Sequence, residues 1–295
     1  MKKELVGFCK ANDIEYMGIA STGPYEDLGH VWKKQIYKGH LIGFEEKEFE
    51  KIIDPTLTMP NVKSIIVCLF PYYVGTFEGA NLSKYVYSSD YHIIIKKKLE
   101  IICEYLIKNI EDFDYKTYAD TGPLNDRYLA YKAGLGFRGI NGHIINNKYG
   151  SYVFIGYILN NYPFEPDKPD DRICMKCYKC IDNCPGQCIT GDGTINPLKC
   201  KSYLTQKKGE LELREIDILR KNPLIWGCDA CQDVCPHNKN IAKTPIEEFR
   251  TNLIYNIECK EINNISHKNF EKKYGNRAFS WRGKKVLKRN CGLLV

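Results

Sequence analysis

Two cysteine-rich segments hold the residues of this chain whose spacing indicates the most specific chemistry. The first segment reads C-M-K-C-Y-K-C-I-D-N-C-P from Cys174, and the second reads C-D-A-C-Q-D-V-C-P from Cys228. Cysteines recur three residues apart in both, and each segment ends on a cysteine followed by proline. A cubane iron-sulfur cluster needs four thiolates that converge on four irons, and closely spaced cysteines can wrap a tight loop around one cube. The spacing therefore predicts two 4Fe-4S clusters.

The two runs also predict how the thiolates divide between the clusters. In runs of this bacterial ferredoxin type, the cysteine before the proline binds the other cluster. The first cluster is expected to take Cys174, Cys177, Cys180 and Cys235, and the second to take Cys184, Cys228 and Cys231. One position of the second cluster is then open, and Cys200 and Cys188 compete for it. We favour Cys200, because Cys188 closely follows Cys184 on the same segment and is less able to reach the far side of a cube.

Zinc and disulfide bonds are the alternative uses of these cysteines. Zinc sites more often use two separated C-x-x-C pairs, whereas a third cysteine three residues on and a following proline are typical of ferredoxins. The chain has 14 cysteines, nine of them from Cys174 to Cys235, and a disulfide framework is not expected in a chain of 295 residues with no sign of export. We expect most of the other cysteines to be buried small apolar residues: Cys9, Cys68, Cys103, Cys259 and Cys291.

Charge and hydropathy restrict the location and the partners. The N-terminal residues lack the apolar stretch and the twin arginines of export signals. The longest apolar run, Ile65 to Phe70, is far too short to span a bilayer. We therefore expect a cytoplasmic protein that does not bind a membrane. The net charge of +7 indicates an anionic partner only weakly and does not by itself identify a nucleic acid.

Short apolar runs alternate with amphipathic segments before the cysteine-rich region. The pattern predicts strands at residues 14–20, 63–70, 113–119 and 150–159, a largely helical segment at 24–51 and an amphipathic helix at 91–110. Between the cysteine runs, residues 197–203 and 212–221 are expected to be helical. The fold class predicted from this order is an α/β (α+β) N-terminal domain followed by a ferredoxin-like domain with two 4Fe-4S clusters.

Composition indicates where these domains meet. Residues 160–171 are rich in proline and aspartate and form the clearest linker of the chain. We expect an α/β domain at residues 1–165 and a cluster domain at 166–250. The remaining residues, 251–295, form a basic extension that is expected to pack back on the core.

Asp120 is the strongest candidate for acid–base chemistry outside the cysteine runs. The predicted strand at 113–119 delivers it to a strand end, where the sequence continues D-T-G-P. Four glycines then follow closely and free the backbone to approach something flat or bulky: Gly134, Gly136, Gly139 and Gly142. They do not form a phosphate loop, because no G-K-[ST] is present and the glycines end a helix. An isolated aspartate at a strand end is more often a turn or capping residue.

Residues 268–290 are strongly basic. Nine lysines and arginines occur there against the single acidic residue Glu271, and Phe279 and Trp281 are interspersed among them. Basic side chains bind phosphates and aromatic rings can stack on unpaired bases, so this segment is a candidate RNA-binding surface. The alternative is a solvated C-terminal helix.

Several of these motifs together resemble the epoxyqueuosine reductase family, which comprises cobalamin-dependent iron-sulfur enzymes of tRNA queuosine synthesis. The family pattern matches at Asp120, Pro123, Asp126–Arg127 and residues 133–141, at Asp90–His92, at N-P-L-K-C-K-S-Y-L-T from Asn196, at Arg289–Asn290 and in both cysteine runs. Ile140 occupies a position where the family usually has lysine, and Ile52 one where arginine is usual. The chain also ends at Val295, without the helical-repeat tail of longer members.

The resemblance implies a cofactor that spacing alone does not suggest. It implies that cobalamin binds between the α/β domain and the cluster domain without a protein histidine on cobalt. Carried over by position, the residues near the corrin are Asp120, Ile144, Ile155, Ser202, Asp229 and Ala230. The implied partners are tRNA, through its anticodon stem-loop, and an external low-potential electron donor, with the protein acting as a monomer.

The resemblance further implies that the protein reduces epoxyqueuosine to queuosine in tRNA. Electrons pass singly through the two clusters to cobalamin, and Asp120 is similar to the general acid of the family. An ordinary aspartate is ionised at neutral pH, so this role requires burial that raises its pKa. Two other functions remain open: a cytoplasmic reductase of a small molecule, similar to reductive dehalogenases, and a non-enzymatic electron carrier, which should tolerate loss of Asp120.

Overall fold

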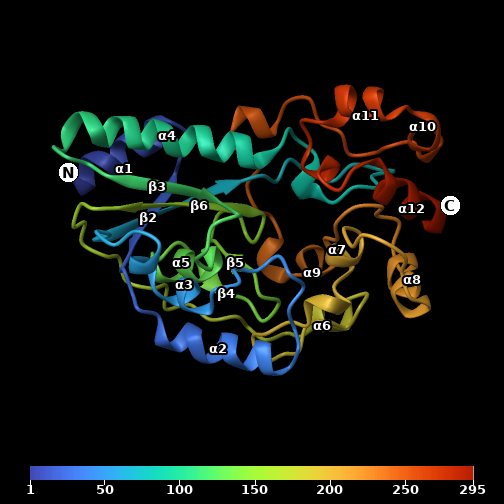
Figure 1. Cartoon of the computed structure of the whole chain (residues 1–295), viewed down its shortest axis with the longest axis horizontal. Coiled ribbons are helices and arrows are strands. Elements are labelled where there is room, and N and C mark those ends of the chain that lie inside the picture. The colour runs from blue at the N-terminus through green and yellow to red at the C-terminus, as the bar shows by residue number, and fades with distance from the viewer. Residues whose placement is uncertain (295) are drawn as a thin grey trace.

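A computed structural model describes residues 1–294 of the chain. Its centre is a four-stranded sheet in the order β1-β2-β6-β3, formed by β1 (Tyr16–Ala20), β2 (Ser64–Pro71), β6 (Val153–Asn160) and β3 (Tyr115–Ala119) (Figure 1). Every neighbouring pair is antiparallel, with Ser64 opposite Asn160 in the central pair. The predicted mixed fold is confirmed, and the antiparallel pairing makes it α+β.

Helices cover both faces of this sheet (Figure 1). On one face lie α1 (Lys2–Ala11) and α4 (Tyr91–Asn109), and on the other lie α2 (Glu26–Tyr37), α3 (Phe49–Ile53) and α5 (Asp126–Lys132). Alternate residues of β2 point to opposite faces, so Ile66 packs in the apolar core under α4 and Ile65 in the core under α5. Because both faces are covered, every residue of β2 is buried.

The predicted helix at residues 24–51 is interrupted. α2 ends at Tyr37, α3 begins at Phe49, and a loop joins them. Gly39 and Gly43 in this loop have φ values of 65° and 77°, a left-handed conformation that favours glycine and breaks a helix. The expectation that residues 24–51 are largely helical was therefore wrong for residues 38–48, which form a loop beside a large cavity described below.

The cysteine-rich region consists of short elements joined by loops (Figure 1). Its helices are α6 (Lys179–Asp182), α7 (Lys201–Leu204), α8 (Leu213–Arg220) and α9 (Ala230–Asp233), with 3-10 turns at Pro197–Lys199 and Pro236–Asn238. The C-terminal helices are α10 (Cys259–Asn264), α11 (His267–Tyr274) and α12 (Lys284–Leu294). The remaining elements are the hairpin of β4 (Phe137–Arg138) and β5 (Ile144–Ile145) and 3-10 turns at Pro55–Leu57, Lys84–Val86, Glu247–Phe249 and Ala278–Ser280.

No helix in the described part of the chain is both long and apolar enough to cross a bilayer. The longest, α4, buries one face and exposes lysines and glutamates on the other, which is the pattern of a helix that packs on a sheet.

A buried ion pair joins the sheet domain to the cysteine-rich region. Lys84, which is 7% exposed, places its Nζ 3.4 Å from Oδ2 of Asp229 and 2.7 Å from Oδ1 of Asp233. Asp229 also accepts hydrogen bonds from the Ser83 hydroxyl and from the backbone N–H of Lys84. The carboxylate of Asp229 is therefore fully occupied by partners from the sheet domain.

We expect Lys84→Met to lower the free energy of unfolding by about 3–5 kcal/mol, because it leaves the Asp229 carboxylate buried without its cation. Urea unfolding followed by circular dichroism measures the change. Lys63→Met is the matched control, since Lys63 is exposed and should be nearly neutral to replace. Equal stabilities of the two variants would contradict a stabilising role for this ion pair.

Helix α12 binds the cysteine-rich region through its polar side chains. The buried amide of Asn290 donates to the carbonyl oxygens of Thr205 and Ile225, both at 2.8 Å. Arg289 donates to the carbonyl oxygen of Lys207 at 2.6 Å. The predicted solvated basic helix is therefore a packing element, and part of its positive charge serves to hold the fold together.

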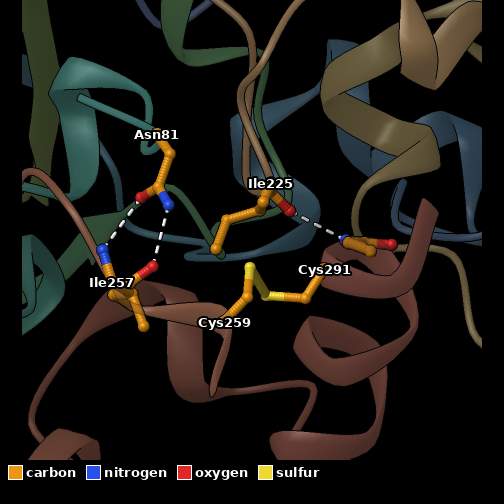
Figure 2. The surroundings of a disulfide bond; sticks show 6 residues. Asn81, Ile225, Ile257, Cys259 and Cys291 are labelled. Carbon is orange, nitrogen blue, oxygen red and sulfur yellow. Dashed lines mark hydrogen bonds between the residues drawn. A yellow bond between two sulfur atoms is a disulfide. The ribbon is translucent and has the colours of Figure 1, made fainter. Parts of the chain in front are cut away.

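A disulfide bond joins Cys259 of α10 to Cys291 of α12, with a Cα–Cα distance of 5.4 Å (Figure 2). The expectation that these two cysteines are reduced was wrong. Residues 32 positions apart are brought together because α10 and α12 pack side by side, a contact that no local spacing could indicate. Near the bridge, Asn81 exchanges two hydrogen bonds with the backbone of Ile257 (Figure 2).

Loop-closure entropy predicts that this bridge stabilises the folded protein by about 4 kcal/mol. Cys291→Ala should lose that amount in oxidising buffer, and reduced wild-type protein should lose a similar amount. Thermal and urea unfolding with and without dithiothreitol measure both values. Cys103→Ala, which removes a buried free thiol and keeps the bridge, is the control, and its stability difference from wild type should be the same in both buffers. A stability of Cys291→Ala that matches oxidised wild type would contradict the prediction.

Candidate functional site

The first predicted set of cysteines lies around one small cavity. Cys174, Cys177, Cys180 and Cys235 all line it, together with Ile140 and His237. Lys176 and Tyr178 have φ values of 50° and 58°, so the backbone turns tightly on either side of Cys177. This turn directs the cysteines of the first run toward the same point, and Cys235 reaches it from the end of the second run, as the spacing predicts.

The second set lies on the wall of a different and much larger cavity. Cys184, Cys228 and Cys231 are brought together there, and both candidates for the fourth position, Cys200 and Cys188, are present. The Sγ atoms of Cys184 and Cys188 are 3.4 Å apart, and Cys188 is also hydrogen-bonded to Cys200. Cys188 thus lies between two other thiols of the set.

Hydrogen bonds from Cys188 change the acidity of its neighbours. They lower the pKa of Cys184 to about 5 and that of Cys200 to about 7, while the pKa of Cys188 itself is raised. These lower pKa values favour the thiolate form, which binds iron, at Cys184 and Cys200, whereas Cys188 keeps its proton as their hydrogen-bond donor. This arrangement favours Cys200 as the fourth ligand.

The donor set of each cavity fits an iron-sulfur cluster, because four cysteine thiols can be assigned to each. A cube of four irons takes four thiolates, one at each corner. Ile140 lies between the two sets, because it lines the small cavity and also packs in the apolar cluster of Cys180, Cys184 and Cys188.

The large cavity has a volume of about 1400 Å³ and lies between the sheet domain and the cysteine-rich region. Pockets for drug-sized ligands are typically about 300–1,000 Å³, so this space can hold a macrocycle together with part of a substrate. Of the residues predicted near a corrin, Asp120, Ile155 and Ser202 line the cavity. Ile144 is buried in the core under α5, and Asp229 and Ala230, at the start of α9, do not line the cavity.

Asp120 lines the same cavity as the second cysteine set. It directly follows β3, as predicted, and has a left-handed φ of 63°. Its Oδ2 accepts a hydrogen bond of 2.7 Å from the Tyr91 hydroxyl and one of 3.2 Å from Nε2 of His92. The other ring nitrogen of His92, Nδ1, is 2.7 Å from Oδ1 of Asp90, which caps α4. Two aspartates therefore hold the His92 ring between them.

These contacts reverse the expected acidity of Asp120. Burial raises the pKa of its carboxyl, but hydrogen bonds from His92 and Tyr91 outweigh burial and hold the pKa below its usual range. The expectation of a raised pKa was therefore wrong. Burial lowers the pKa of His92, but its hydrogen bonds to Asp120 and Asp90 outweigh this and raise the pKa to about 9. At neutral pH the pair consists of an aspartate anion and an imidazolium cation.

Three further polar residues line this cavity: Asp126, Arg127 and His143. Burial raises the pKa of Asp126 to about 6. Burial and the charge of Arg127 lower the pKa of His143 to about 3, so that His143 is neutral, and its Nε2 lies 3.8 Å from Sγ of Cys231. Sequence indicates Asp126 and Arg127 only as part of a motif and gives no signal for His143, whose partners come from distant segments.

Aromatic and basic side chains form a rim at the cavity. The Arg282 guanidinium lies 3.7 Å from the centre of the Trp281 ring and 4.8 Å from that of Phe44, which comes from the loop between α2 and α3. Trp281 is 53% exposed and can stack on a ligand, whereas Phe279 is fully buried. The prediction that Phe279 is available to stack on bases was therefore wrong.

The fold and the two cysteine sets are those of an iron-sulfur oxidoreductase. Residues 173–238 match the family model for a 4Fe-4S double cluster binding domain, and residues 53–121 match the model described as "Epoxyqueuosine reductase QueG, DUF1730". A relative from Bacillus cereus, named epoxyqueuosine reductase, is 36% identical over all of this chain and 80% of its own length. The chain belongs to the epoxyqueuosine reductase family.

Solved structures agree with this assignment. The structure of epoxyqueuosine reductase from Streptococcus thermophilus superimposes with a TM-score of 0.91 and 32% identity, over 99% of this chain and 80% of that one. A second structure with the same TM-score and coverage is described as epoxyqueuosine reductase with an epoxyqueuosine-modified tyrosine tRNA stem loop.

Proposed function

We propose that this protein reduces epoxyqueuosine to queuosine in the anticodon stem-loop of a tRNA. The proposal rests on one observation: the cysteine thiols of the second set and the Asp120–His92 pair line the same cavity. Removal of an epoxide oxygen as water takes two electrons and two protons. The second cysteine set is the source of electrons and the Asp120–His92 pair is the source of protons, and both line this cavity.

Two 4Fe-4S clusters and cobalamin are the cofactors that this arrangement fits. We assign Cys174, Cys177, Cys180 and Cys235 to the first cluster and Cys184, Cys200, Cys228 and Cys231 to the second. Ile155 and Ser202 would contact cobalamin in the large cavity. When bound, the clusters supply electrons one at a time and cobalamin supplies the reducing centre that meets the substrate carbon.

Side chains of the protein itself hold and transfer the proton. His92 holds it at Nε2, 3.2 Å from Oδ2 of Asp120, and Asp90 orients the ring through Nδ1. Asp120 faces the cavity, with its side chain 56% exposed there. A ligand that fills the cavity displaces water and makes the Asp120 anion less stable, which favours transfer of the proton from His92 to Asp120 and then to the departing oxygen.

Activity should consequently depend on pH through His92. Because the pKa of His92 is raised to about 9, we expect turnover to fall as the pH rises through about 9 and the proton is lost. His92→Asn should abolish this alkaline limb as well as lower the rate. Single-turnover rates from pH 6 to pH 10 measure it, with absorption spectra as the control for cofactor loss. An alkaline limb that persists in His92→Asn would exclude His92 as the group that titrates.

Binding of tRNA is supported by exposed positive charge in residues 268–288, the segment that also brings Trp281 to the cavity. Lys268, Lys272, Lys285 and Lys288 are exposed, whereas Arg277 and Lys284 donate to backbone carbonyl oxygens inside the protein. Trp281 provides an exposed ring for an unpaired base. The stem-loop structure of a protein with 32% identity supports the same partner.

We extend the proposal to the location, oligomeric state, electron donor and domain division of the protein. We propose that the protein acts in the cytoplasm as a monomer, with an external low-potential electron donor. The working units are the cobalamin-binding domain at residues 1–165, the cluster domain at 166–250 and the basic extension at 251–295, which packs back through Asn290.

Anaerobic turnover tests the function. Protein with both clusters reconstituted is mixed with cobalamin, a chemical reductant and tRNA that contains epoxyqueuosine, and the nucleosides are analysed by mass spectrometry. Loss of one oxygen atom from the modified base is the expected result. If the base is unchanged while a small organohalide is reduced under the same conditions, the substrate is a small molecule and the proposal is wrong.

A further inference from the structure

We propose that residues 173–179 form the docking surface for the electron donor, and that this donor is an acidic one-electron carrier protein. The inference rests on the proposed function, because it assumes that the first cysteine set holds a cluster. It concerns where electrons enter the protein, which the reaction in the large cavity does not determine.

Access to the two cysteine sets differs. Cys177 of the first set is exposed on the loop before α6, and the cavity that this set lines is separate from the large one. The second set faces the large cavity, where Cys184 is buried. A protein donor that approached the second set from the large cavity would compete with the substrate for that space. The first set is therefore the entry point that stays open while substrate is bound.

The loop around Cys177 exposes apolar side chains next to this entry point. Ile173 is 80% exposed, Met175 is 55% exposed and Tyr178 is 50% exposed. Three large apolar residues that are exposed within six positions form a patch that favours contact with another protein. The patch is small, which suits the small interfaces of transient electron-transfer complexes. Such complexes must form and dissociate once for each electron transferred.

The charge of the same loop identifies the kind of partner. Lys176 and Lys179 are exposed, Lys239 is exposed shortly after Cys235, and residues 173–179 include no acidic residue. The adjacent Arg172 is paired with Asp170, and the exposed acids beside the loop are Asp171, just before it, and Asp182, at the end of α6. A basic rim around an apolar patch attracts a partner with an acidic surface and raises the association rate at low salt.

The proposed step involves electrons only. In each encounter the donor, a low-potential flavin or iron-sulfur protein, is oxidised by one electron and the first cluster is reduced by one. No covalent bond forms or breaks and no proton moves at this surface. The donor then dissociates, and a second encounter supplies the second electron that the reaction needs.

Stopped-flow reduction of the reconstituted protein by flavodoxin hydroquinone, an acidic flavin protein, tests the proposal without tRNA. In the double variant Lys176→Glu/Lys179→Glu, we expect the second-order rate of flavin oxidation to fall at least about tenfold at low salt. Added salt should also slow this reaction less in the variant than in wild type. The matched control is Lys3→Glu/Lys10→Glu on α1, which changes the net charge equally at two other exposed lysines and should leave the rate nearly unchanged.

Two further measurements distinguish a lost docking surface from a damaged cluster. Reduction by the methyl viologen radical, a small cation, should not slow in the Lys176→Glu/Lys179→Glu variant, and its iron content should equal that of wild type. Ile173→Ser/Met175→Ser should weaken saturation by flavodoxin without changing the salt dependence. Equal slowing in both lysine variants, or none in either, would overturn the proposal. The turnover test with a chemical reductant would still stand in that case, because it does not use this surface.

Discussion

Asp120→Asn should lower turnover by about 10²–10⁴-fold, the range expected when a positioned acid–base group is lost. Asparagine can still accept hydrogen bonds from Tyr91 and His92, so the wall of the cavity should keep its shape. It carries no negative charge, however, and cannot accept a proton from His92 and pass it on. Single-turnover assays of oxygen loss from the modified base measure the effect.

The absorption spectra of the variant should match those of wild type, because Asp120 is not a predicted ligand of any iron. Asp112→Asn is the matched control, since Asp112 is another exposed aspartate with a left-handed backbone, at φ 52°. It should retain full activity. If Asp120→Asn turns over at the wild-type rate, the proton comes from another group and the assignment of Asp120 is wrong.

Cys200→Ala should prevent assembly of the second cluster, whereas Cys188→Ala should preserve it. A double-cluster protein contains about eight irons and each cubane about four, so Cys200→Ala should lose about half of the iron. The physical reason is that Cys200 is held as a thiolate by its hydrogen bond from Cys188, while Cys188 keeps its proton. Iron analysis and electron paramagnetic resonance of the reduced protein measure the difference.

The two cysteine variants control for each other, because both residues lie beside Cys184 in the same set. Cys188→Ala removes a hydrogen-bond donor from two thiolates, so its second cluster should also be harder to reduce. The reverse result, with iron lost from Cys188→Ala and kept in Cys200→Ala, would show that Cys188 is the ligand. Loss of half of the iron from both variants would contradict a ligand role for Cys200 alone.

Features set by local spacing could be predicted from the sequence. The division of the cysteines into two sets follows from intervals of three and four residues, and the structure places each set on one cavity. The strand that ends at Ala119 delivers Asp120 as expected, because an apolar run and a following turn are both local signals. The family pattern then indicated which strand-end aspartate to favour over an ordinary turn residue.

Features that depend on contacts between distant segments could not be predicted. The acidity of Asp120 is set by Tyr91 and His92, which lie at the start of another element. The disulfide joins two helices that pack only in the complete fold, and Phe279 is buried because its 3-10 turn packs into the core. In each case the sequence supplied the residue type, and tertiary packing decided its role.

The position of Asn290 determines when the cysteine-rich region can be completed during protein synthesis. Its amide binds the backbone of Thr205 and Ile225, which lie between Cys200 and Cys228 of the second cysteine set in sequence, yet it emerges from the ribosome more than fifty residues after Cys235. For that interval every predicted iron ligand has been synthesised while these two hydrogen bonds are still unmade. The cysteine-rich region can therefore reach its final packing only after the last helix has docked.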